Sequence, residues 1–112
     1  MKKINRVKKY REFQEILDKH HFVKNELYKV YFRKNEYGFE RYGLLVTKKN
    51  GIAVTRNKIK RQVRTIIDKV SDYSKSLDVV VVVSKRYDTN QYKENEIELT
   101  TLLSKIRSEY DK

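Results

Sequence analysis

An uninterrupted apolar run in the second half of the chain constrains the fold more than any other feature. Residues 77–84 read LDVVVVVS, so that five consecutive valines are bounded by polar residues. β-branched residues favour strands, and a run without polar alternation is typical of a strand that is buried on both faces, as in a parallel pairing. The run therefore predicts an internal strand of a layered fold.

Two other segments predict strands by their alternation. Residues 27–33, LYKVYFR, alternate with period two, which is the pattern of a half-buried strand. One face carries Tyr28, Val30 and Phe32, and the other carries Lys29, Tyr31 and Arg33. After a turn at 35–38, residues 40–47 predict a strand whose buried face carries Tyr42, Leu44 and Val46. On its other face Gly43 leaves the backbone uncovered, which often marks the close approach of another group.

Helical periodicity predicts three helices around these strands. The first covers residues 7–19, with apolar positions at Val7, Tyr10, Phe13, Ile16 and Leu17. The second runs from about 54–56 to 70, after a turn at Asn50 and Gly51. The third begins within 88–91 and carries Leu99, Leu102, Leu103, Ile106 and Tyr110. His20 and His21 are interpreted as loop residues. This order of elements predicts an α+β or α/β sandwich in one domain, 1–112, with residues 1–6 as a basic, mobile arm.

The positive charge is concentrated in the first part of the chain. The net charge is +12, and residues 1–64 alone hold 19 Lys and Arg against 6 Asp and Glu, whereas the remainder carries −1. This asymmetry predicts a basic surface and an acidic partner. Nucleic acid is the commonest such partner, and an anionic membrane surface is the alternative.

Residues 48–64, KKNGIAVTRNKIKRQVR, hold seven cations and no acid. Apolar residues at 59, 63, 66, 67 and 70 form one face of a helix. The other face carries Arg56, Asn57, Lys60, Arg61 and Arg64. Cations in the first turns oppose the helix macrodipole, so the arrangement does not stabilise the helix. A polyanion relieves both the charge repulsion and the unfavourable dipole, because a helix start also attracts phosphate.

The sequence also excludes several kinds of site. Without cysteine there are no disulfides or thiolate metal sites, and the adjacent histidines have no partner at ligand spacing. The N-terminus lacks the apolar segment of a secretory signal, and no apolar run approaches the roughly 18 residues that span a bilayer. We therefore expect a soluble, cytoplasmic protein without a metal site formed by its side chains.

Three segments together resemble the protein subunit of bacterial ribonuclease P. Residues 41–49, RYGLLVTKK, match the family strand R-x-G-[LF]-x-V-[ST]-K-K, and residues 51–64 contain the family helix R-N-R-x-K-R-x-x-R. Residues 5–13, NRVKKYREF, match N-R-[VL]-K-K-x-x-[ED]-F. The resemblance covers about residues 4–105. One departure is Lys58 at the third position of R-N-R, where lysine keeps the charge but loses the bidentate fork of arginine.

The resemblance implies an α+β helix–sheet sandwich, with about three helices on a mixed, mostly antiparallel sheet. This is the fold of ribosomal protein S5 domain 2, and it contains a left-handed strand–helix–strand crossover. The general rule that about 98% of such crossovers are right-handed predicts the opposite hand.

The resemblance also implies a function in which the catalyst is RNA. In this family the holoenzyme removes the 5′ leader of precursor tRNA by Mg²⁺-dependent hydrolysis of one phosphodiester. The protein docks on the catalytic RNA and holds the leader between the first helix and the sheet. We thus expect ribonuclease P RNA and precursor tRNA as partners, Mg²⁺ held mainly by RNA, no obligate protein partner and no catalytic residue in the protein.

Two sets of residues are expected to carry this function. The contacts to the catalytic RNA are Arg56, Asn57, Lys58, Lys60, Arg61, Arg64, Lys48 and Lys49. The leader-binding cleft consists of Phe13, Leu17, Tyr31, Lys29 and Arg33. The strand alternation independently places Tyr31 between two cations, and a cationic groove with aromatic faces binds single strands. Periodicity alone favours a role in the core for Phe13, and it is the resemblance that favours a contact with the leader.

Three other functions fit part of the sequence. A generic structured-RNA-binding protein, such as a ribosome-associated one, shares the charge argument but predicts no preference for precursor tRNA. An unaided protein nuclease needs convergent carboxylates or an acid–base set, for which the spacing gives no signal. A helix reading a DNA major groove through Asn57 and Arg61 is the third, but the chain shows no dimerisation pattern.

Overall fold

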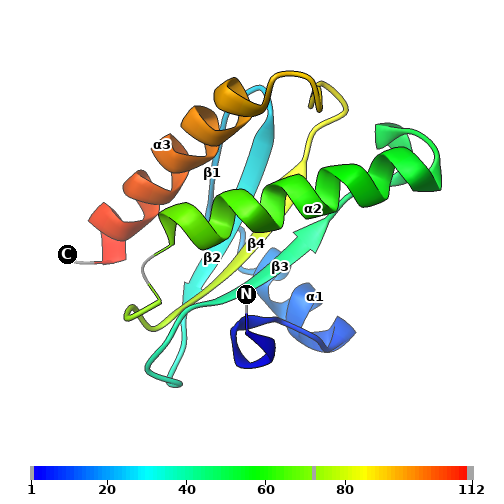
Figure 1. Cartoon of the computed structure of the whole chain (residues 1–112). Helices are drawn as coiled ribbons and strands as arrows, with labels where there is room; N and C mark the ends of the chain where they lie inside the picture. Colours follow the sequence, from blue (N-terminus) through cyan, green and yellow to red (C-terminus); the bar gives the residue numbers. More distant parts are fainter. Residues whose placement is uncertain (1, 72, 111–112) are drawn as a thin grey trace.

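A mixed four-stranded sheet forms the middle layer of the molecule, with α1 on one face and α2 and α3 on the other (Figure 1). The computed structural model describes residues 2–71 and 73–110. The helices are α1 (Tyr10–Asp18), α2 (Ala53–Val70) and α3 (Tyr92–Tyr110), with short 3-10 helices η1 (Lys3–Asn5) and η2 (Lys48–Asn50). The strands are β1 (Phe22–Lys24), β2 (Tyr28–Lys34), β3 (Arg41–Leu45) and β4 (Leu77–Val83).

The valine run forms the internal strand β4, as predicted. The strand order is β1-β2-β4-β3, and β4 pairs antiparallel with β2 and parallel with β3. Every residue of β4 except Val82 is buried. The absence of polar alternation in this segment therefore reflects a layer of structure on each face.

Alternate residues of β4 belong to different layers of the core. Val79, Val81 and Val83 pack with the buried faces of α2 and α3, whereas Val80 packs with Ile16 of α1. The larger layer contains Ile59, Val63, Ile66 and Ile67 of α2 and Leu99, Leu102, Leu103 and Ile106 of α3. Full burial of each such side chain contributes about 1.5–3 kcal/mol. The apolar stripe of α2 therefore faces the sheet, and its basic face points outward.

The crossover from β3 through α2 to β4 is left-handed. Viewed with α2 in front of the sheet and with β3 and β4 pointing upward, the chain leaves β3, returns along α2 and enters β4, which lies to the left of β3 (Figure 1). A right-handed crossover would enter a strand on the right. The general preference for right-handed crossovers predicted the opposite, so the resemblance was the better guide.

The start of the chain packs against the sheet. Asn5 is 5% exposed, and its amide donates a hydrogen bond to the carbonyl of Glu40 at 2.7 Å. The N–H of Val7 donates to the carbonyl of Tyr42 at 2.9 Å, so α1 begins at Tyr10 rather than at the predicted position 7. Met1, the first residue of the expected arm, lies outside the described residues, and the mobility of the arm stays a prediction.

Strand β1 was not predicted, because three residues are too few to show an alternation. It follows α1 through His20 and His21, the two predicted loop residues. His20 has φ 54°, a left-handed conformation that is uncommon for residues other than glycine. Its N–H donates a hydrogen bond to the carbonyl of Leu17 near the end of α1. This turn sends the chain back along the edge of β2, where β1 pairs antiparallel.

Candidate nucleic-acid interface

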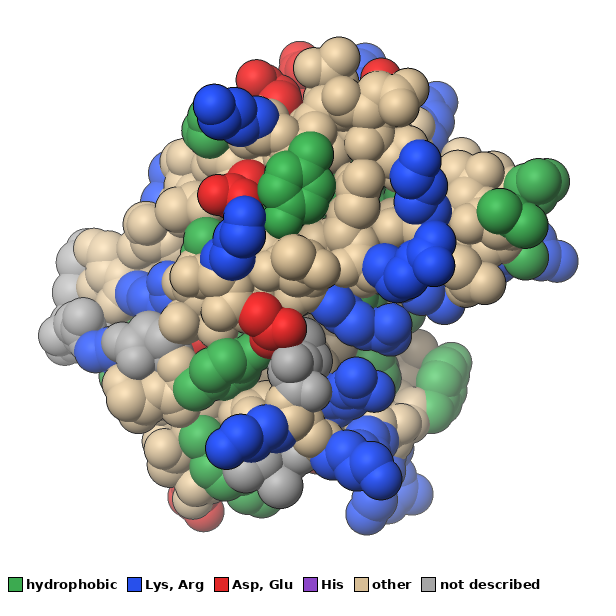
Figure 2. All heavy atoms as spheres, viewed as in Figure 1, with side chains coloured by type: hydrophobic (Ala, Val, Ile, Leu, Met, Phe, Trp, Pro, Cys, Tyr) green, Lys and Arg blue, Asp and Glu red, His purple; other side chains and the backbone are tan. Residues whose placement is uncertain are grey.

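The predicted docking residues form one exposed surface on the outer side of α2. None of Arg56, Asn57, Lys58, Lys60, Arg61 and Arg64 is buried. Figure 2 shows Lys and Arg side chains in a band that starts over the first half of α2 and continues toward the N-terminal part of the molecule. Because the opposite stripe of α2 is buried, the helix presents these side chains to solvent as one set.

The first turn of α2 has neither a side-chain cap nor an acidic residue to offset this positive charge. Its N-cap is Ile52, which makes no side-chain cap, and no acid lies in the first turn. The preceding helix η2 has Thr47 at its N-cap and Gly51, with φ 105°, at its C-cap. The hydroxyl of Thr47 accepts a hydrogen bond from the N–H of Lys49. Free backbone N–H groups and cations therefore converge at the start of α2, which favours a bound anion.

A hollow beside η2 brings three lysines together. Lys48 and Lys49 line it with Lys85, which follows β4. The amide of Asn50 donates to the carbonyl of Ser84 at 2.8 Å and fixes η2 against the end of β4. Lys85 was not among the predicted site residues, because its position beside η2 depends on the parallel pairing of β3 with β4.

The predicted leader-binding residues lie on the other face of the sheet. Phe13, Leu17 and Tyr31 are half-buried around the small core of Val7, Ile16 and Val80. A Cβ added to Gly43 would lie 2.5 Å from Cε1 of Phe13, so the glycine is required for the ring to lie on β3. This confirms the predicted close approach at Gly43. Phe13 thus contacts the core and also belongs to a partly exposed surface on the α1 side of the sheet, which we call the open face. It consists of Phe13, Leu17, Tyr31, Lys29 and Arg33.

Lys29 and Arg33 differ in how free their side chains are. The ammonium of Lys29 lies 4.2 Å from the ring centroid of Phe22 and 5.1 Å from that of Tyr31. Arg33 instead donates to Asp78 and to Glu15, both at 3.1 Å. Its guanidinium is therefore engaged within the fold, although one-fifth of the side chain remains exposed.

Asp78 organises a buried network of charges at one end of the sheet. It is fully buried and accepts hydrogen bonds from Arg33, Asn35 and Arg41 at 2.8–3.1 Å. Burial alone would raise the pKa of Asp78, but these hydrogen bonds outweigh it, so the pKa lies below its usual range. Arg41 also pairs with Glu12 at 2.7 Å. The network therefore joins α1 to the strands that carry the open face.

A second group of cations comes from the start of the chain. Lys3, Arg6, Lys8, Lys9 and Arg11 line a shallow groove together with Glu12, Tyr37 and Arg41. These residues were counted in the charge argument but were not predicted as a site, since no periodicity relates them.

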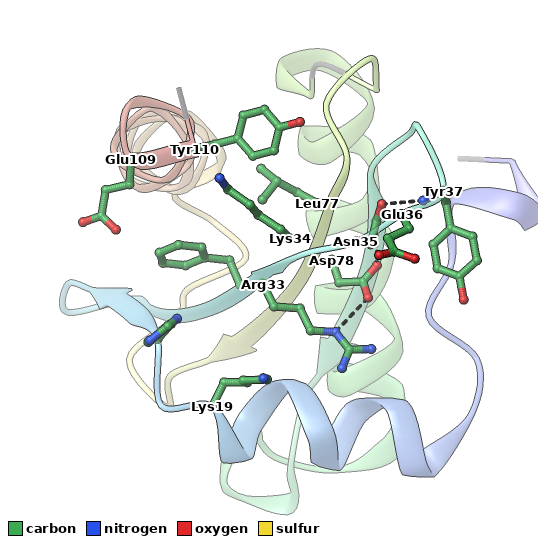
Figure 3. Close-up of a pocket in the computed structure, with 12 residues that line it drawn as sticks. Lys19, Arg33, Lys34, Asn35, Glu36, Tyr37, Leu77, Asp78, Glu109 and Tyr110 are labelled. Carbon is green, nitrogen blue, oxygen red and sulfur yellow. Dashed lines mark hydrogen bonds and ion pairs between the residues drawn. The ribbon is translucent and has the colours of Figure 1, made fainter. Parts of the chain in front are cut away.

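The pocket in Figure 3 has a different character. It encloses about 820 Å³ between the end of β2, the start of β4 and the end of α3. Arg33 points toward Asp78 on one side, and Lys34 points toward Tyr110 on the other, 5.4 Å from the ring centroid. Its cations are balanced by Glu36, Asp78 and Glu109, so the pocket is not part of the basic surface.

Two further properties concern the described residues alone. Among residues 2–71 and 73–110, no group of three or more His, Cys, Asp or Glu side chains is placed to hold a metal ion. In that same part of the chain, every helix is too short or too polar to cross a membrane.

Comparison with known proteins identifies the family. The family model for ribonuclease P matches residues 1–107. The ribonuclease P protein component of Mesoplasma florum is 43% identical over 105 residues, which cover 92% of this chain and 96% of that protein. That of Mycoplasma mycoides is 36% identical over 111 residues, covering 96% and 100%.

Solved structures agree with these relatives. The ribonuclease P protein of Staphylococcus aureus has a TM-score of 0.77 at 35% identity, covering 89% of this chain and 93% of that one. The protein from Thermotoga maritima has a TM-score of 0.76 at 32% identity, covering 89% and 96%. In sequence and in fold, the chain belongs to the ribonuclease P protein family.

Proposed function

We propose that this chain is the protein subunit of a ribonuclease P, an endoribonuclease in which RNA is the catalyst. The protein binds the catalytic RNA and the 5′ leader of precursor tRNA, and it assists removal of the leader to form the mature 5′ end. It supplies no catalytic residue and needs no obligate protein partner. Its place of action is the cytoplasm, where precursor tRNA is made in bacteria.

The outer face of α2 is the observation that carries this proposal. Six polar or basic side chains project from one side of a helix whose other side is buried, and the helix start lacks a compensating acid. Such a surface is unfavourable alone and becomes favourable against phosphate. Lys48 and Lys49 extend it at η2. We assign this surface to the catalytic RNA.

The open face of the sheet supports a role in leader binding. Phe13, Leu17 and Tyr31 offer partly exposed apolar surface, and Lys29 adds a cation beside the ring of Tyr31. Aromatic rings next to cations bind single strands without demanding a sequence, at about 1–3 kcal/mol per stacked base. Arg33 positions α1 through Glu15 and offers only its exposed edge to the leader.

Mg²⁺ is proposed to be held mainly by the RNA. This expectation comes from the family resemblance, in which the catalyst is the RNA. In the assembled enzyme Mg²⁺ would supply the activated water and stabilise the leaving oxygen. The protein would contribute by positioning the two RNA molecules.

The decisive experiment is cleavage of a precursor tRNA at low Mg²⁺ with the catalytic RNA alone, the protein alone, and both together. We expect activity only with both components. Activity of the protein alone would refute RNA catalysis. The absence of stimulation in any mixture would reduce the chain to a generic structured-RNA-binding protein.

The variant Phe13→Ala tests the leader site separately. It should weaken binding of precursor tRNA to the holoenzyme and leave binding of mature tRNA nearly unchanged, because only the precursor carries a leader. Equal losses for both tRNAs would mean that Phe13 serves the core alone.

A further inference from the structure

Strand β1 places an exposed aromatic ring beside the proposed leader site. Phe22 pairs directly with Tyr31 in the antiparallel register, so both side chains lie on the face of the sheet that carries α1. Their ring centroids are 5.4 Å apart. Phe22 is 37% exposed and stands on the edge strand, whereas Tyr31 is partly covered. The aromatic surface of the open face therefore continues to the edge of the sheet.

Two lysines lie in directly opposed positions on the same face of the sheet as this ring, an arrangement that is unfavourable without an anion. Lys24 of β1 lies directly opposite Lys29 of β2, on the same face as Phe22. Like charges in directly opposed positions of a strand pair destabilise the pairing. Neither lysine has an ion-pair partner among the described residues. A phosphate between the two ammonium groups would remove the repulsion.

The ammonium of Lys29 also joins the two rings. It lies 4.2 Å from the centroid of Phe22 and 5.1 Å from that of Tyr31, distances at which a cation is attracted to an aromatic ring. The ring of Phe22 is thus held next to a positive charge while much of the residue stays accessible. This is the combination by which single-stranded nucleic acid is bound without sequence readout.

We propose that Phe22, Lys24 and Lys29 form a subsite for one unpaired nucleotide, with its base stacked on Phe22 and its phosphate between the lysines. The inference rests on the proposed function and deepens it, since the nucleotide belongs to the leader strand after it passes Phe13 and Tyr31. The subsite makes the edge strand β1 part of the RNA-binding surface. It predicts tolerance of any base at that leader position.

The test uses the reconstituted holoenzyme and precursor tRNAs that carry 2-aminopurine at successive leader positions. With Phe22→Ala we expect binding of precursor tRNA to fall at least about fivefold, the lower end of the effect of one stacked base. One leader position should lose its fluorescence quenching, and binding of mature tRNA should not change. Phe22→Tyr should restore both signals, whereas Phe22→Leu should not, because it retains apolar bulk without the aromatic face.

Ile97→Ala provides a matched control, since it removes another exposed apolar side chain from α3. It should leave all tRNA binding unchanged. Urea unfolding of each variant separates loss of fold from loss of contact. Wild-type affinity in Phe22→Leu, or equal losses for precursor and mature tRNA in Phe22→Ala, would overturn the subsite.

The outcomes also separate this inference from the proposed function. A wild-type holoenzyme that binds precursor and mature tRNA equally would refute leader binding itself. A wild-type enzyme that prefers the precursor, with Phe22→Ala behaving identically, would refute the subsite alone. Lys24→Gln should lower the slope of log affinity against log salt for precursor binding by about 0.7, the value for one phosphate contact to a single strand. An unchanged slope would refute the phosphate contact of Lys24.

Discussion

Replacement of Asp78 by asparagine is expected to destabilise the protein by about 3 kcal/mol. The change removes a buried negative charge that two guanidinium groups face at the end of the sheet. Asp78 is fully buried, and Arg33 and Arg41 both donate to it. An asparagine keeps one acceptor oxygen but turns an amide nitrogen toward these donors, and it leaves Glu12 and Glu15 as the only carboxylates paired with the two arginines in the described part of the chain.

The magnitude follows from how buried each partner is. Removal of one member of a buried ion pair costs about 3–5 kcal/mol. The side chain of Arg41 is 9% exposed, but that of Arg33 is 20% exposed and also pairs with Glu15, so the lower end applies. Since 1 kcal/mol corresponds to about 4 °C for a chain of this size, the Tm should fall by about 12 °C.

Urea unfolding measures this loss directly. With a slope near 1.5 kcal/mol/M, the midpoint should fall by about 2 M while the slope stays constant. Glu96→Gln is the matched control, because Glu96 pairs with Lys69 at 3.4 Å on the surface. It should change the free energy of unfolding by less than about 0.5 kcal/mol.

Acid titration gives a second readout of the same network. The pKa of Asp78 in the folded state lies below its usual range, because the hydrogen bonds from Arg41, Asn35 and Arg33 outweigh the effect of burial. The unfolded state therefore binds the proton first, at about pH 3.9, and the contribution of Asp78 is present above that pH and lost as the pH falls through the folded pKa. Asp78→Asn should show a flatter acid limb than the wild type.

A loss of less than about 1 kcal/mol in Asp78→Asn, with an unchanged acid limb, would refute the reasoning. It would mean that Glu12 and Glu15 neutralise the two arginines without Asp78.

Three other changes test separate features. Gly43→Ala should cost about 1–3 kcal/mol and abolish preferential binding of precursor tRNA, because the new methyl group displaces the ring of Phe13; wild-type binding would show that the ring position is unimportant. His20→Gly should stabilise the fold by about 0.5–1 kcal/mol in urea unfolding, since the relief of the left-handed strain exceeds the added chain entropy; a lower midpoint would contradict this. Arg61→Gln should weaken docking on the catalytic RNA and lower the slope of log affinity against log salt by about one. The control Lys93→Gln on α3 should change neither the affinity nor the slope. An unaltered slope in Arg61→Gln would argue against the docking surface.

Much of the fold was predictable because its strongest patterns are local. The alternation of β2, the apolar run of β4 and the stripe of α2 each follow from neighbouring residues and from the period of the element. The predicted contact at Gly43 also came from a local argument, the absence of a side chain on a strand face. Five residues of the α2 surface, Arg56, Asn57, Lys60, Arg61 and Arg64, follow from helix geometry, whereas Lys58 was included because of the family resemblance.

Features that depend on distant pairing were not predictable. Strand β1 exists because it pairs with β2, and three residues carry no readable period of their own. Arg33 was predicted on the same strand face as Tyr31, as the structure has it, but its partner Asp78 lies 45 positions away, at the polar start of the valine run. Phe22 and Lys85 were missed for the same reason. The hand of the crossover followed from the family resemblance and not from general physics.

The central place of β4 has a consequence for the order of events during synthesis. Residues 77–83 lie between β2 and β3 in the sheet, yet they are translated after both. Before they emerge, β3 lacks its parallel neighbour, and the layers under α1 and α2 lack the valines that they share. All of the excess positive charge, +13 over residues 1–64, has been made by then. The nascent chain therefore passes through a stage in which it already carries all of its excess positive charge while its sheet is not yet assembled.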